Sequence, residues 1–411
     1  MRISTNTIFD GNVNLLNQQQ MRLFQTQQQI ATGRRVVTPA DDPVAAARAI
    51  EVGQSDAMNT QFQSNQTSVT SSLEVVDGTL SNVTNLLTSI RTLATTAGNM
   101  VLSNAERQAI ASDLRGQLQE LIGQANSTDG AGTYLFSGFQ GTTKPFVETA
   151  TGVQYMGDDG QRMAQVSPSR QLATTDPGSD IFMRVKNGNG TFVVSPAVAN
   201  TGSGVSGTGQ VLNPALLTGA AYQVNFSVVA GVTTYTVMNN TAVPPVQVLP
   251  TPPATGAPYV SGQAITFDGL QFDIRGTPAN GDTFTVAPST NQSVFQTVSN
   301  LINALSAPVT PGIPSTSANI SQNVSNAIAG LDGALNNVLT IRASVGARMN
   351  EVDALKSMSD SLSTQYKQHL SQLQDLDYNK ALSDLAQQQL SLQAAQKSFV
   401  QVNNLSLFNY M

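Results

Sequence analysis

The stretch YNKALSDLAQQQLSLQAAQKSFVQV, residues 378–402, decides the fold of this chain. It contains no Pro or Gly, and large apolar side chains recur in it every seven residues, which places them on one face of an α-helix. The same step occurs at the opposite end of the chain. We therefore predict two helices whose narrow apolar stripes pack together: Phe9, Leu16, Leu23 and Ile30 within residues 1–40, and Tyr378, Leu385, Leu392 and Phe399 within residues 375–411.

The surface around these stripes predicts self-association. Gln is the commonest residue at the intervening positions, and only 11% of all residues are charged, against about 25% in ordinary soluble domains. One pair of such helices buries too little apolar surface to offset the entropy lost on ordering the chain. We expect further copies of the same helices to cover them, so that the ends order only in an assembly. The alternative to packing between copies is a stable helical bundle within one chain. We favour this alternative for residues 44–125, packed against residues 317–355.

The composition excludes several classes of function. The formal net charge of -6 provides no basic surface for nucleic acid. The absence of Cys excludes disulfides, thiolate metal sites and cysteine nucleophiles. The sequence contains no apolar run of about 18 residues, so it predicts no membrane-spanning helix. Residues 1–12 lack the basic start and apolar core of a cleavable signal peptide, so we expect any export to use another route.

Residues 41–142 predict the first half of a helical rod. Asp41-Asp42-Pro43 is typical of a helix start, with Asp as N-cap and Pro at the first helical position. Apolar residues then recur in alternating steps of four and three, which predicts one helix from Val44 to about Ala97. Ser103 and Glu106 predict a capping box that begins a second helix. Residues 133–136 predict a short strand that leads into a turn or a β-hairpin.

The sequence changes character in residues 143–290, where Gly, Pro, Thr, Val and Asn are abundant. Short alternating runs such as 222–226 are separated by turn signals, which predicts a β-rich inserted outer domain. Helical steps return in residues 291–374 and predict the second half of the rod, running back beside the first. The predicted fold class is mainly α: a long antiparallel coiled-coil or helical-bundle rod with a β domain inserted at its far end.

No motif predicts an active site. Gly202-x-Gly204-x-x-Gly207 matches a dinucleotide-binding loop by letter, but no helical pattern follows that would place a phosphate at a helix N-terminus. Gly157-Asp158-Asp159-Gly160 has too few oxygen ligands for calcium, and we interpret it as a hairpin turn. His369 is the one histidine and lies in a helical pattern. We predict no catalytic residue, no cofactor and no metal, and an enzyme is the least favoured class.

Three segments resemble the flagellin superfamily. The segment IATGRRVVTPADDP, residues 30–43, is similar to the family's serine-glycine-basic segment and Asp-Asp helix start, although Thr32 stands where relatives often carry Ser. The segment YLFSG, residues 134–138, followed by Pro145-Phe146, resembles the hook-associated branch more than flagellin itself. Residues 405–408, LSLF, also fit, and the expected assembly interface therefore extends to Leu405.

This resemblance covers about residues 1–146 and 260–411, and it implies an axial structural protein of the bacterial flagellum. A member of this branch would form a ring of copies at the hook–filament junction, outside the cell, after export by the flagellar type III apparatus. Its partners would be the first hook-associated protein, flagellin and a cytosolic export chaperone. Flagellin itself is the alternative function, and a coiled-coil adhesin or phage fibre is a more distant one.

Overall fold

The computed structural model describes residues 5–99 and 101–408 of the 411-residue chain, and side chains over residues 9–99 and 101–401. Leu405 therefore lies outside the described side chains. The chain divides into two compact units, each described by itself below. The first comprises Met1–Gln66, Val166–Pro168 and Asp353–Met411, and the second comprises Thr67–Gln165 and Ser169–Val352.

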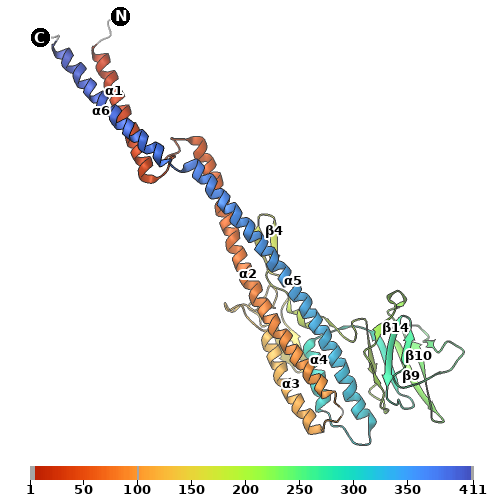
Figure 1. Ribbon diagram of the computed structural model, residues 1–411. Helices are drawn as coiled ribbons and strands as arrows, with labels where there is room; N and C mark the ends of the chain where they lie inside the picture. Colours follow the sequence, from red (N-terminus) through yellow and green to blue (C-terminus); the bar gives the residue numbers. More distant parts are fainter. Residues whose placement is uncertain (1–4, 100, 409–411) are drawn as a thin grey trace. The chain divides into compact units, whose positions relative to one another are not determined.

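Long helices account for both ends of the chain, as predicted (Figure 1). Pro begins both of the longest helices, at a position where the missing N–H has no helical partner to lose. Helices are also present where helical steps return in the sequence after residue 290. The helices are α1 (Thr5–Thr32), α2 (Pro43–Ala97), α3 (Asn104–Ala125), α4 (Val294–Ser306), α5 (Pro314–Gln374) and α6 (Tyr378–Phe408).

Both predicted helix starts are capped in the expected way. The Asp42 carboxylate accepts a hydrogen bond of 3.0 Å from the Ala45 N–H, and this bond holds the pKa of Asp42 below its ordinary value. At α3, Ser103 Oγ accepts from the Glu106 N–H, and the Glu106 carboxylate accepts from the Ser103 N–H at 2.7 Å. The second bond lowers the pKa of Glu106.

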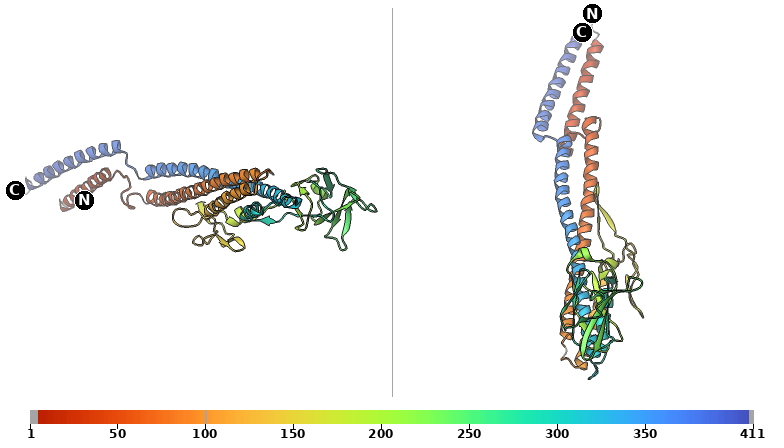
Figure 2. Two further views of the ribbon diagram at one scale, coloured as in Figure 1. Left: turned by 90° about the horizontal axis from the view of Figure 1, so that it is seen from below. Right: turned by 90° about the vertical axis from the view of Figure 1, so that its right-hand side faces the viewer.

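The apolar stripe of α2 is buried in the second unit. From Val69 to Ala94 the alternating steps of four and three select side chains that are each no more than 1% exposed. The facing helix α5 supplies Leu331, Val338 and Val345, which are equally buried. Two ion pairs tie α2 to α5, one between Arg91 and Asp332 at 2.5 Å and one between Arg342 and Asp77 at 2.9 Å. Within this unit the two helices run side by side (Figure 2).

The central part of the chain is β-rich, as predicted. Its largest sheet has the order β11-β10-β9-β15-β6, with β12 paired to β10, and a second sheet has the order β13-β14-β7, with β8 paired to β14. Side chains alternate between buried and half-buried from Tyr222 to Phe226, because β9 turns one face toward a core that includes Phe272 and Phe284.

Two shorter pairs, β1 with β2 and β16 with β5, complete the antiparallel ladders in the second unit. The strands are β1 (Phe146–Thr149), β2 (Gly152–Tyr155), β3 (Met163–Ser167), β4 (Arg170–Ala173), β5 (Val185–Lys186), β6 (Phe192–Pro196), β7 (Val205–Ser206), β8 (Gln210–Val211), β9 (Tyr222–Val229), β10 (Val232–Asn239), β11 (Val246–Leu249), β12 (Ala257–Pro258), β13 (Ala264–Phe267), β14 (Leu270–Arg275), β15 (Thr283–Pro288) and β16 (Asn291–Gln292).

The strand predicted at residues 133–136 is wrong. Tyr134 forms only an isolated bridge with Thr128, and the chain then turns. Leu135 and Phe136 are both buried, whereas consecutive side chains of a strand point to opposite faces. Gly138 closes the turn with φ +69, a conformation that L side chains rarely adopt. The hairpin begins several residues later, where β1 pairs with β2.

Candidate assembly surface

The terminal helices α1 and α6 pack against each other and run antiparallel (Figures 1 and 2). The rings of Phe9 and Phe399 lie with their centroids 5.3 Å apart and tilted by 45°. Since both stripes advance by seven residues, this contact places the remaining residues opposite each other in reverse order. The pairs are Leu16 with Leu392, Leu23 with Leu385, and Ile30 with Tyr378. We call these residues of α1 and α6 the terminal seam.

No residue of the terminal seam is buried within the single chain. Phe9 is 42% exposed and Tyr378 is 51% exposed, while the other members are half-buried. Two helices in contact shield only the line between them, and the flanks of a narrow stripe stay open to water. The structure thus brings the predicted residues together without covering them.

Further apolar side chains project from the same two helices, and the sequence analysis did not predict them as part of the surface. They lie off the seven-residue step, so a search that follows one periodic stripe passes over them. Their exposed fractions range from 50% for Leu15 to 69% for Leu390. Large exposed apolar side chains gathered on one element are typical of a surface that another molecule covers. We call this set the outer patch: Leu15, Met21 and Phe24 on α1, and Leu382, Leu390 and Val400 on α6.

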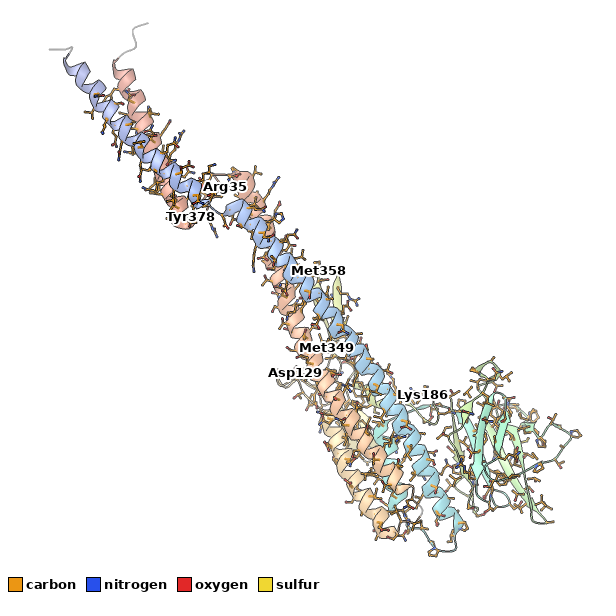
Figure 3. The ribbon with its side chains drawn as sticks, in the orientation of Figure 1. Arg35, Asp129, Lys186, Met349, Met358 and Tyr378 are labelled. Carbon is orange, nitrogen blue, oxygen red and sulfur yellow. The ribbon has the colours of Figure 1, made fainter. Side chains whose placement is uncertain are left out.

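In the first unit, the helices of the N-terminal and C-terminal segments are both interrupted at the same level, beside Arg35 and Tyr378 (Figure 3). The Arg35 N–H donates to the Gln374 carbonyl at 2.7 Å, and the Leu376 N–H donates to the Gly33 carbonyl at 3.0 Å. Each segment therefore satisfies a backbone carbonyl at the end of the other's helix.

The side chain of Arg35 strengthens this crossing. Its Nη2 donates to the Leu373 carbonyl at 2.8 Å, and its Nη1 pairs with the Asp42 carboxylate at 3.1 Å. Asp41 accepts the Thr38 N–H at 2.7 Å and the Val37 N–H at 3.0 Å, and these bonds lower its pKa. We call the crossing the clasp. It contains the basic segment and the Asp-Asp helix start on which the family resemblance rests.

The glycine motif at residues 202–207 begins at a loop that binds a carboxylate of the protein itself. Asp282 accepts hydrogen bonds from the N–H groups of Thr201 at 2.8 Å, Gly202 at 3.0 Å and Ala279 at 2.8 Å. A phosphate would compete with this carboxylate for the same donors. The loop is therefore a structural turn.

The other candidate sites have structural roles too. The run Gly157–Gly160 is not the predicted hairpin turn, since it joins β2 and β3, which do not pair with each other. Asp158 there accepts the N–H groups of Phe139 and Gly160. His369 is exposed on α5. Over the part of the chain that the structure describes, no group of three or more His, Cys, Asp and Glu side chains is arranged to hold a metal ion.

No helix within residues 5–99 and 101–408 is long and apolar enough to cross a membrane.

Comparison with known proteins identifies the family. The bacterial flagellin N-terminal helical region matches residues 3–141, and the bacterial flagellin C-terminal helical region matches residues 328–411. The crystal structure of flagellar hook-associated protein 3 from Legionella pneumophila is 30% identical, with a TM-score of 0.74 over 78% of this chain and 98% of that one. This chain belongs to the flagellar hook-associated protein 3 family.

Other members of the hook-associated protein 3 family match as well. That of Escherichia coli strain K12 is 26% identical over 408 residues, which cover 99% of both chains. The Xanthomonas campestris structure is 28% identical, with a TM-score of 0.70 over 78% of this chain and 99% of that one. Family membership makes this chain a structural component of the flagellum and not an enzyme, as predicted.

Proposed function

We propose that this chain forms a ring of copies that joins the flagellar hook to the filament, and that neighbouring copies interlock through α1 and α6. The incomplete burial of the terminal seam carries this proposal. Phe24 is 68% exposed and Leu390 is 69% exposed, and both belong to the outer patch on the same helices. The surrounding positions are rich in Gln and poor in charge, which suits a close neighbour of the same kind better than bulk water.

A second copy is the occupant that best fits this surface. An acidic or basic partner would need opposite charge, and α1 and α6 offer little of either sign. Copies of the same two helices would bring apolar stripes of matching period and glutamines that both donate and accept hydrogen bonds. We propose that Phe9, Leu16, Leu23, Ile30, Tyr378, Leu385, Leu392, Phe399 and Leu405 form the assembly interface together with the outer patch.

The finer assignments follow from this role. We propose the first hook-associated protein on one face of the ring, flagellin on the other, and a cytosolic export chaperone that holds the C-terminal region before export. Export would use the flagellar type III apparatus without a cleaved signal peptide. Residues 1–40 and 375–411 would be the assembly helices, 41–142 and 291–374 the rod, and 143–290 an outward-facing domain. The breaks at the clasp support the inner limits of the assembly helices.

Electron microscopy of a strain that lacks this chain tests the proposal. We expect hooks without filaments and flagellin shed into the medium, with normal filaments restored by the unchanged chain. Leu392→Asp and Phe24→Asp should fail to restore filaments, because each puts a charge into a surface that a neighbour must cover. Gln393→Asp is the matched control on an exposed position and should restore them. Normal filaments from both Leu392→Asp and Phe24→Asp would contradict the proposal.

A further inference from the structure

The terminal seam alone does not fix how α1 is aligned with α6. Both stripes repeat every seven residues, so sliding one helix by seven residues along the other re-forms most of the apolar pairs. Leu16, for example, would then face Leu385 or Phe399 in place of Leu392. The clasp holds the end of α1 beside the start of α6, and a further feature along the two helices can favour the same alignment.

The positions midway between seam residues supply such a feature. Gln19 lies between Leu16 and Leu23, and Gln388 lies between Leu385 and Leu392. Both line one cavity of about 220 Å³, together with Arg22, Asp384, Gln387 and Ser391. The Oε1 atoms of both glutamines are buried and have no hydrogen-bond partner. One polar layer thus interrupts the apolar seam in the middle of the pair.

The next layer along the pair has a different character. Thr26 is 8% exposed and Ala381 is 5% exposed, and the Thr26 hydroxyl donates to the Arg22 carbonyl of its own helix. These small side chains need nothing from the opposite helix. Gln19 and Gln388 differ from these residues, because their buried Oε1 atoms have no partner on their own helix. Each can gain a hydrogen bond only from the opposite helix or from a donor in the shared cavity.

We propose that Gln19 and Gln388 determine the register of α1 against α6. Each amide carries donors and an acceptor, so two glutamines in one layer can pair in the observed alignment. A slip of seven residues in either direction places Gln19 opposite Ala381 or Ala395, whose methyl groups offer no partner. A polar residue at one seam position costs stability and selects one register, as in coiled coils. Gln19 and Gln388 belong to one chain and line the same cavity, so their proposed role stands apart from the proposed assembly.

Cysteine cross-linking measures the register, because the natural chain contains no Cys. Thr26→Cys with Ala381→Cys reports the observed alignment. Leu23→Cys with Leu392→Cys reports a slipped one, since these positions are offset by seven residues, about 10 Å of helix, in the observed alignment. A disulfide needs Cα atoms within about 7 Å. Each pair is placed in the full-length purified chain, oxidised, and read as cross-linked monomer on a non-reducing gel.

The ratio of observed to slipped cross-link is the readout, because it does not depend on how much of the pair is formed. We expect Gln19→Leu/Gln388→Leu to lower this ratio about tenfold, the scale of one lost buried polar pairing. The control Gln18→Leu/Gln393→Leu makes the same chemical change at exposed positions and should leave it unchanged.

A second variant controls for aggregation caused by the added leucines. Gln19→Ala/Gln388→Ala removes the amides without adding apolar surface, and it should lower the ratio in the same direction. An unchanged ratio in both variants, or an equal fall in the control, would overturn the proposal.

Discussion

The apolar stripe of α2 from Val69 to Ala94 and the terminal seam share the same sequence period, yet they differ in how much protein covers them. Each stripe residue of α2 is no more than 1% exposed, whereas no residue of the terminal seam is buried. The α2 stripe shares its unit with α3, α4 and α5, which contribute buried residues of their own. The terminal seam is formed by two helices alone, so each apolar stripe is covered along a single line of contact. The period of a stripe predicts the helix, and the number of neighbours decides its burial.

The largest expected contrast comes from removing one leucine from each stripe. Leu80→Ala should lower the free energy of unfolding of the second unit by about 2 to 5 kcal/mol, because it leaves a cavity at a fully buried position. Leu392→Ala should change the stability of the dilute chain by less than about 0.5 kcal/mol, since Leu392 is only half-buried there. Urea unfolding followed by circular dichroism measures both. Equal losses would remove the distinction between the two stripes.

The two units also differ in how deeply their ion pairs are buried. Arg348 and Asp176 form an ion pair in the second unit with side chains only 12% and 8% exposed, and Arg348 also donates to the Ala173 carbonyl at 2.8 Å. Asp176→Ala should destabilise that unit by about 3 kcal/mol, because it leaves a buried guanidinium without its carboxylate. The Arg35–Asp42 pair of the clasp is 46% and 33% exposed. Asp42→Ala should destabilise the first unit by only about 1 kcal/mol, mainly because α2 loses its N-cap, and the same urea titrations compare the two variants.

The backbone of the clasp gives a smaller, local effect. Gly33 has φ +71, and a Cβ added there would lie 2.9 Å from the Tyr378 hydroxyl. Gly33→Ala should therefore destabilise the clasp by about 1 kcal/mol and speed amide exchange at Arg35 and Leu376. Gly11→Ala is the control, because a Cβ at Gly11 meets nothing within 4 Å. Unchanged exchange at Arg35 and Leu376 in Gly33→Ala would show that the crossing does not depend on this glycine.

Acid should loosen the clasp before it affects the α2 stripe. The pKa values of Asp41 and Asp42 are both depressed, the first mainly by the Thr38 N–H and the second mainly by the Ala45 N–H. A depressed folded-state pKa contributes stability that is present above the unfolded value of 3.8 and is lost as the pH falls below it. The amide signals of Thr38 and Ala45 in an NMR pH titration should move below pH 3.8, while those of Leu80 and Val83 stay fixed. Joint movement of all four would contradict this order.

The sequence predicted the local elements of this structure and the pairing of its two ends, but not the individual hydrogen bonds between distant residues. Caps such as Ser103 with Glu106 depend on residues three apart, so their chemistry is visible in the letters. Arg35 and Leu373 lie 338 residues apart, and no local pattern links them. The strand predicted at 133–136 failed because the aromatic and apolar residue types favour a strand, whereas Leu135 and Phe136 are buried in a turn.

One part of the candidate surface could be predicted from the sequence, and the other part could not. A seven-residue step identifies the terminal seam, because every member lies on one face of its helix. The outer patch has no such step, and Phe24 and Leu390 stand out only once the exposed fraction of each side chain is known. Which glutamines face the partner helix likewise depends on the contact between Phe9 and Phe399, which joins the two ends of the chain.

Amide hydrogen exchange on the dilute full-length chain and on the same chain in isolated flagella tests whether neighbouring copies complete the apolar surfaces of α1 and α6. We expect fast exchange over residues 9–32 and 378–401 in the dilute chain and strong protection of both segments in flagella. Residues 69–94 should be protected in both samples. Strong protection of the terminal helices in the dilute chain, unchanged on assembly, would contradict the claim that their apolar surfaces are completed by neighbouring copies.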